Sequence, residues 1–252
     1  MLRRMLTLFA VLIVGAPTGA QLPEKLENLQ YFPKDISRER LVQRMREFSF
    51  ALGVRCQYCH AGGDGVSFEG VVFSSDEKPA KAKARAMLRM VDHLNQTMLP
   101  QVPSRAEPRI TVDCVTCHRG LPLPKTLQTT LLEIVDTDGT AAAIARYREL
   151  RRDMALGRYN FDEWEVNELA RRLAQAGNTE AAIAILEMNG EFYPKSAAID
   201  FQLGELHRMR GERDKAIQRY RTALEKAPRH EGARRRLEEM EKKGGASGQA
   251  MR

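Results

Sequence analysis

The sequence predicts an all-α protein with two helical regions in series. Apolar residues recur at three- and four-residue steps in the segments 37–52 and 79–98, which is the period of an amphipathic helix. The segment 161–228 repeats itself after 34 residues, the length of a helical-hairpin repeat. The chain of 252 residues is long enough for two such regions, each with its own core.

Residues 1–20 are predicted to be a secretory signal peptide. Two arginines precede an apolar run from Met5 to Ala16, and small residues lead to a cleavage site after Ala20. The run is short for a membrane span, and a retained N-terminal anchor is the alternative. We therefore expect an exported protein, located in the bacterial periplasm and either soluble or peripheral to the membrane.

The first predicted helix covers residues 37–52. Ser37 is expected to cap its N-terminus, and Gly53 is expected to end it. Its apolar stripe consists of Leu41, Met45, Phe48 and Leu52.

Two CxxCH motifs contain all four cysteines of the chain. The first is Cys56-Gln57-Tyr58-Cys59-His60, and the second is Cys114-Val115-Thr116-Cys117-His118. Disulfides suit an exported protein, and a four-cysteine zinc site would use both pairs, but neither explains why His follows the second Cys twice. A redox thiol pair of the thioredoxin type would need a βαβ context, which these helical surroundings do not provide.

Covalent attachment of haem accounts for every residue of both motifs. Two thiols add across the two vinyl groups of one haem, and the following His binds the iron. The sequence therefore predicts two covalently attached haem c groups. Their attachment residues are Cys56, Cys59, Cys114 and Cys117, and their proximal iron ligands are His60 and His118.

The sixth ligand of the first iron is expected on the helix that precedes its motif. Met45 lies in the middle of the apolar stripe, and a thioether ligand raises the potential of haem iron. From periodicity alone, iron binding and ordinary core packing by Met45 stay equally open.

Three stretches together resemble the cytochrome c subunit of photosynthetic reaction centres. They are NLQYFPKDISRERLVQRMREFSFALGVRCQYCH, FSSDEKPAKAKARAMLRMVDHLN and CVTCHRG, and the resemblance runs from about Asn28 to Gly120. That family binds haems in pairs, each along a helix that supplies a Met ligand, so the resemblance implies Met45 on the first iron. It also implies electron transport with a redox protein partner, such as a membrane-bound electron-transfer complex. The family usually has four haems in two pairs, whereas this chain has one pair of motifs.

The second predicted helix, Pro79–Met98, is expected to supply the sixth ligand of the second iron. Its apolar stripe consists of Met87, Met90, Val91, Leu94 and Met98. The resemblance in ARAMLRMVDHLN favours Met90, with Met87 next, and His93 beside the stripe is a further alternative.

The C-terminal half is predicted to be a tetratricopeptide-repeat domain that binds protein partners. A shift of 34 residues matches Leu169 with Leu203, Gly177 with Gly211, Ala182 with Ala216, Ile183 with Ile217 and Pro194 with Pro228. A role as a mere spacer is the alternative. His207 and His230 are expected to be surface residues.

These observations give five predicted segments. They are a signal peptide (1–20), a dihaem cytochrome c domain (21–124), a connecting helix (125–160), the repeats with a capping helix (161–243) and a disordered tail (244–252). The net charge of +7 fits a basic face for an acidic redox partner or anionic lipid, and no nucleic-acid motif accompanies it.

The predicted function is electron transfer rather than catalysis. The sequence has no nucleophile elbow, paired-carboxylate motif or nucleotide loop. A dihaem enzyme of the peroxidase type and a haem-based sensor are the alternatives, and each needs one iron with an open distal site.

Overall fold

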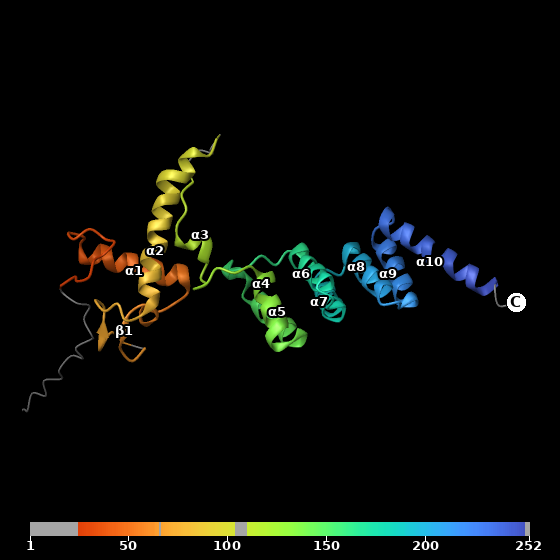
Figure 1. Ribbon diagram of the computed structural model, residues 1–252, viewed down its shortest axis with the longest axis horizontal. Coiled ribbons are helices and arrows are strands. Elements are labelled where there is room, and N and C mark those ends of the chain that lie inside the picture. Colours follow the sequence, from red (N-terminus) through yellow and green to blue (C-terminus); the bar gives the residue numbers. More distant parts are fainter. Residues whose placement is uncertain (1–24, 66, 104–109, 250–252) are drawn as a thin grey trace, which may run out of the picture. The chain divides into compact units, whose positions relative to one another are not determined.

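The computed structural model describes residues 25–65, 67–103 and 110–249. These residues fall into two compact units, which are divided between Pro122 and Leu123 (Figure 1). The predicted all-α fold is confirmed, since helices account for nearly all regular structure of the described residues. The predicted signal peptide lies outside the described residues. The predicted domain boundaries stay predictions.

The first unit is built around two long helices. Helix α1 (Arg38–Leu52) begins at Ser37, whose hydroxyl accepts a hydrogen bond from the backbone N–H of Arg40, and it ends at Gly53 in the left-handed conformation, so both predicted ends are confirmed. Helix α2 (Pro79–His93) continues as a π-helical turn (Leu94–Met98) and a 3-10 turn (Leu99–Gln101).

Short elements complete the first unit. The first CxxCH motif forms a 3-10 turn (Cys56–Tyr58), and the second forms helix α3 (Cys114–His118). Strands β1 (Ala61–Gly62) and β2 (Val71–Val72) pair antiparallel, with Ala61 opposite Val72. This small hairpin was not expected from the sequence.

The second unit is a series of helical hairpins. Its helices are α4 (Leu127–Asp138), α5 (Thr140–Arg152), α6 (Glu163–Gln175), α7 (Thr179–Phe192), α8 (Ala197–Met209), α9 (Arg213–Lys226) and α10 (Glu231–Gln249). Neighbours pack as α4–α5, α6–α7 and α8–α9 pairs, and α10 packs on α9. Where one connecting helix was expected over 125–160, two helices form, because Gly139 breaks the segment at a φ of 88°.

The 34-residue period reflects buried positions of the second unit. Leu169 and Leu203 are both fully buried, as are Ala182 and Ala216. A Cβ atom on Gly204 would lie 2.6 Å from the ring of Tyr220, so a small residue is required where α8 and α9 meet. Packing between helices therefore explains the spacing found in the sequence.

Two details of α8 and α10 differ from expectation. His207 was predicted at the surface, and this is wrong: its side chain is buried, and its Nδ1 lies 2.6 Å from a carboxylate oxygen of Glu212. The Glu212 carboxylate gives the buried His207 a partner that periodicity alone does not reveal. Helix α10 extends to Gln249 and so includes the first residues of the predicted tail.

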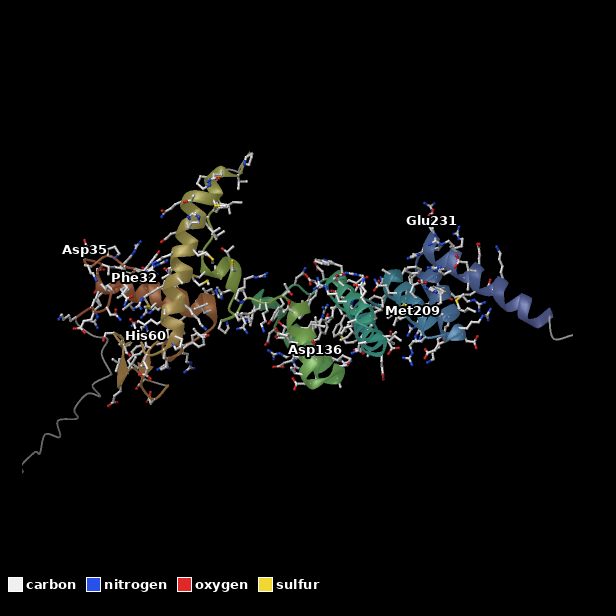
Figure 2. The ribbon with its side chains drawn as sticks, viewed as in Figure 1. Phe32, Asp35, His60, Asp136, Met209 and Glu231 are labelled. Atoms are coloured by element: carbon white, nitrogen blue, oxygen red, sulfur yellow. The ribbon has the colours of Figure 1, made fainter. Side chains whose placement is uncertain are left out.

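None of the helices in the described residues is long and apolar enough to span a bilayer. Figure 2 shows the side chains of both units, with His60 and Phe32 in the first unit and Met209 in the second.

Candidate functional site

A cavity of about 610 Å³ lies in the first unit, and residues of both CxxCH motifs line it. This volume is within the usual range for a cofactor pocket. The motif residues in its lining are Cys56, Cys59, His60, Cys114 and His118. The structure thus brings together two motifs that are far apart in the sequence. Cys117 is exposed and is not among the lining residues.

The walls of the cavity are mainly apolar, and the two long helices supply much of them. Helix α1 contributes the whole predicted stripe: Leu41, Met45, Phe48 and Leu52. Helix α2 contributes Ala80, Ala84, Met87 and Leu88. A flat apolar group such as a porphyrin fits these walls, because burying its surface is favourable where the lining is apolar.

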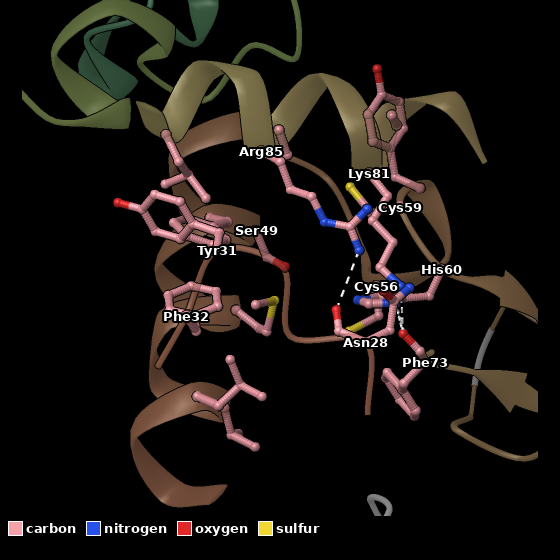
Figure 3. A pocket seen from close by; sticks show the side chains of 18 of the residues that line it. Asn28, Tyr31, Phe32, Ser49, Cys56, Cys59, His60, Phe73, Lys81 and Arg85 are labelled. Carbon is pink, nitrogen blue, oxygen red and sulfur yellow. Dashed lines mark hydrogen bonds between the residues drawn. The ribbon is translucent and has the colours of Figure 1, made fainter. Parts of the chain in front are cut away.

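The first motif is shaped by a tight turn. The backbone N–H groups of Cys59 and His60 both donate to the carbonyl of Cys56, at 3.1 and 3.0 Å. Nδ1 of His60 lies 3.2 Å from the carbonyl oxygen of Phe73, just after β2 (Figure 3). With a proton on Nδ1 donated to that carbonyl, the lone pair of Nε2 is available to bind iron. Burial, followed by the charge of Lys81, lowers the pKa of His60 and so favours the neutral imidazole that a metal ligand needs.

The second motif begins with a capping box. The carboxylate of Asp113 accepts from the backbone N–H of Thr116 at 3.0 Å, and the Thr116 hydroxyl accepts from the backbone N–H of Asp113 at 3.0 Å. Nδ1 of His118 lies 2.8 Å from the carbonyl oxygen of Leu121. His118 therefore has the same arrangement as His60, with Nε2 left for a metal.

Asn95 fixes the chain that leads into the second motif. Its side-chain amide donates to the carbonyl of Val112 at 2.8 Å, and its side-chain oxygen accepts from the N–H of Val112 at 2.9 Å. Asn95 lies in the π-helical turn after α2, a kind of turn that is often found at functional sites. Sequence reasoning missed this residue, because Asn95 has no special position in the helical pattern.

Two glycines bring the motifs together. Gly53 follows α1 and Gly120 follows α3, and the N–H of Gly120 donates to the carbonyl of Ala51 at 2.8 Å. A Cβ atom on Gly53 would lie only 2.2 Å from the carbonyl oxygen of Gly120. The sequence shows Gly53 as a helix stop but does not reveal its close approach to Gly120.

The alternative chemistries of the cysteines find no support in this geometry. All four cysteines are free thiols, so no disulfide forms among them. Within the described residues, no group of three or more His, Cys, Asp or Glu side chains is arranged to hold a metal ion. Burial is the largest cause that raises the pKa values of Cys59 and Cys114, which keeps both as thiols.

The predicted sixth ligands are placed differently. Met45 lines the cavity. Of the candidates on α2, Met87 lines it, while Met90 and His93 are not among its lining residues. Met87 and Met90 each have 46% of their surface exposed.

Charged groups close one side of the cavity. Arg85 and Lys81, both on α2, pair with Asp76 at 2.9 and 3.4 Å. Hydrogen bonds from Arg85 and Asn28, with the charges of Arg85 and Lys81, hold the pKa of Asp76 far below its usual range. Lys81 also donates to the carbonyl of Phe73 at 2.8 Å, the same oxygen that faces His60. This cluster keeps the loop after β2 in place beside the first motif.

Two CxxCH motifs around one apolar cavity in a helical unit are the arrangement expected of a c-type cytochrome, a class that carries covalently bound haem c. Residues 40–156 match the sequence model of the photosynthetic reaction centre cytochrome C subunit family, so the predicted resemblance is confirmed. The matched region begins in α1 and extends beyond the first unit, through α4 and α5.

Two curated relatives agree with this assignment. Cytochrome c-554 of Chloroflexus aurantiacus is 40% identical over 74 residues, which are 29% of this chain and 16% of the relative. The photosynthetic reaction center cytochrome c subunit of Roseobacter denitrificans is 29% identical over 102 residues, which are 40% of this chain and 26% of the relative. The chain thus matches about a sixth and about a quarter of the length of these proteins.

Proposed function

We propose that this protein is an exported dihaem c-type cytochrome that transfers electrons between protein partners. Cys56 and Cys59 hold one haem by thioether bonds, and Cys114 and Cys117 hold the other. Each bond forms when a thiol adds across a vinyl group, with the sulfur going to one carbon and the proton to the other. Haem, when bound, supplies an iron that alternates between the ferric and ferrous states.

The observation that supports this proposal best is that the two histidines have equivalent hydrogen-bond partners. Nδ1 of His60 faces the carbonyl of Phe73, and Nδ1 of His118 faces the carbonyl of Leu121. These bonds orient each ring and direct the free nitrogen to a metal. Both histidines line one apolar cavity together with three of the four free thiols, which supports a role for both motifs in binding haem.

Methionines complete the proposed iron coordination. Met45 serves the first iron, which agrees with its place in the cavity wall. For the second iron, Met90 stays the predicted ligand, and Met87 and His93 are its alternatives. Met87 lies in the cavity wall and is therefore the stronger alternative. A second iron with neither a methionine nor His93 as its sixth ligand would have an open site, as a haem enzyme or a sensor requires.

The decisive measurement is the haem content of the purified protein. A pyridine haemochrome assay combined with intact mass is expected to show two haems per chain and no free thiol. The variant Cys114→Ser/Cys117→Ser should retain one haem, and Cys56→Ser/Cys59→Ser should retain the other. A chain with two disulfides, or with bound zinc and no haem, would refute the proposal.

The proposed partners are redox proteins, including a membrane-bound electron-transfer complex. One relative is named as a subunit of a photosynthetic reaction center, which makes such a complex a specific candidate. We propose that the stacked hairpins of the second unit are tetratricopeptide repeats and bind this partner, since helical hairpin arrays commonly present extended binding surfaces.

A further inference from the structure

The first residues of the described chain form one wall of the cavity. We call the segment Lys25–Phe32 the N-terminal strap. All of its residues are among those that line the cavity, and its backbone has neither helical nor strand structure. Since the segment forms no regular hydrogen bonds of its own, its position depends on side chains.

Three side chains of the strap bond to distant parts of the first unit. Asn28 donates to the carbonyl of Ser74 at 2.6 Å, and Gln30 donates to the carboxylate of Asp76 at 2.9 Å. Tyr31 donates its hydroxyl proton to Asp92 of α2 at 2.7 Å. These partners are 46 or 61 residues away in the sequence, so the strap is tied to distant parts of the first unit.

Aromatic packing attaches the strap to the other long helix. The ring of Phe32 stacks on Phe48 of α1, with centroids 6.3 Å apart, and Tyr31 meets Phe32 edge-on at 5.1 Å. The backbone carbonyl of Asn28 also accepts a bond from Arg85 of α2 at 3.4 Å (Figure 3). The strap therefore bridges α1 and α2, the two helices that supply the main apolar walls.

The strap extends past residues of both motifs. Tyr31 of the strap and Cys114 of the second motif line the same cavity, so the strap reaches the cavity that the second motif shares. The loop after β2, where Asn28 is attached, also supplies the carbonyl that orients His60. One segment is thus in a position to shield both attachment sites.

We propose that the N-terminal strap is the closing wall of the haem cavity, held shut by Asn28, Gln30 and Tyr31, and that it keeps water away from both irons. The inference rests on the proposed function. Exclusion of water favours the ferrous state, because ferric iron has the higher charge and gains more from a polar surrounding. The strap would then hold the potentials of the haems above those of an open cavity.

Two conservative substitutions release the strap without straining it. Asn28 has a φ of 58°, so Asn28→Gly removes the amide while the backbone keeps its left-handed conformation. Tyr31→Phe removes the hydroxyl that bonds to Asp92 and keeps the ring. The matched control is Tyr159→Phe, which removes a hydroxyl from a tyrosine of the second unit that is not among the residues lining the cavity.

Limited digestion of the holoprotein with chymotrypsin measures strap opening. The protease cleaves after Tyr31, and it also accepts Phe at this position, so wild type and variants share the same cleavage site. Cleavage of a transiently open segment follows its open fraction. Loss of both hydrogen bonds in Asn28→Gly/Tyr31→Phe is expected to raise the cleavage rate about tenfold.

A redox titration of the same samples tests closure of the cavity. The double variant should have lower haem potentials than wild type, while Tyr159→Phe should match wild type in both measurements. Unchanged cleavage would show that these bonds do not hold the strap. Faster cleavage with unchanged potentials would show that the strap does not close the cavity. If the wild-type protein lacks haem, the proposed function itself fails. If it contains haem but the strap variants behave like wild type, only the inference about the strap fails.

Discussion

His60 and His118 each depend on a backbone carbonyl that lies outside the CxxCH motif. Both histidines were predicted from CxxCH alone, because the spacing of two thiols and an imidazole has a specific chemical purpose. Their carbonyl partners were not predictable in the same way. Phe73 is 13 residues from His60 and is positioned by a hairpin of two-residue strands, which leaves almost no pattern in the sequence.

The methionine ligands can be assigned residue by residue. Met45→Ala is expected to abolish one far-red Fe(III)–sulfur absorption band and to lower one potential, since thioether sulfur stabilises ferrous iron. Met90→Ala is expected to open the second iron, so that the ferrous protein binds carbon monoxide. Absorption spectra with and without carbon monoxide measure both effects.

Three further variants make this assignment decisive. Met87→Ala and His93→Ala should leave the spectrum unchanged if Met90 is the ligand. Met209→Ala is the control for loss of a methionine, because Met209 is exposed in the second unit. Opening of the site by Met87→Ala or His93→Ala would move the ligand to that residue. If wild-type ferrous protein already binds carbon monoxide, the pure carrier function fails and catalysis or sensing takes precedence.

At the scale of elements, the contact between the ends of α1 and α3 sets the distance between the motifs. Gly53→Ala adds a Cβ at 2.2 Å from the Gly120 carbonyl oxygen, on a backbone with a φ of 65°. Gly65→Ala is a matched control, because Gly65 has a φ of 83° and no atom within 4 Å of the added Cβ. The control should lose about 1–2 kcal/mol of unfolding free energy from backbone strain alone.

Gly53→Ala is expected to lose more, about 3 kcal/mol or above, because the clash adds to the strain. Thermal unfolding monitored by circular dichroism measures the stability, and the spectrum of the second haem reports displacement of α3. Equal effects of Gly53→Ala and Gly65→Ala would show that the glycine contact does not matter for the position of the motifs.

The helices differ in how far their sequence predicts them. Helices α1 and α2 follow from apolar periodicity, a cap and, for α2, a proline at its first position. The π-helical turn after α2 does not, since Asn95 stabilises it through a contact with Val112 that only the folded chain creates. The connecting segment 125–160 was predicted to form one helix, and the break at Gly139 that separates α4 from α5 was not predicted.

At the scale of the whole molecule, the two units should be separable. A chain that ends at residue 124 is expected to retain its haem spectrum, and a fragment that begins at Thr126 should be helical and free of haem. The fragment must include α4 and α5, because their buried residues Leu127, Leu131 and Tyr147 belong to the core that continues through α6 and α7. Each such side chain contributes about 1.5–3 kcal/mol when buried.

Circular dichroism, haem content and partner capture test this separation. The fragment that begins at Thr126 should melt at a higher temperature than one that begins at Phe161, which lacks the α4–α5 pair. The chain without the second unit should lose capture of its redox partner while it keeps both haems. If removal of the second unit prevents haem attachment, the repeats belong to the core of the haem domain.

Similarity of sequence and compactness of structure divide this chain at different places. The family match ends at residue 156, after α5, whereas the first compact unit ends at Pro122. The sequence indicated a helical join between the halves, but only packing shows that α4 and α5 share a core with α6 and α7. Their burial pattern belongs to the hairpin array, although their residues match the cytochrome family.

The second motif depends on contacts that are closer in the sequence than those of the first motif. The capping box of Asp113 and Thr116 and the bond from His118 to the Leu121 carbonyl all fall within nine consecutive residues, 113–121. A peptide of that length contains everything that caps its helix and orients its histidine. The first motif depends on the more distant Phe73 and on the charged groups around Asp76. To transfer a haem attachment site from this protein into another helical scaffold, residues 113–121 are therefore the segment to use.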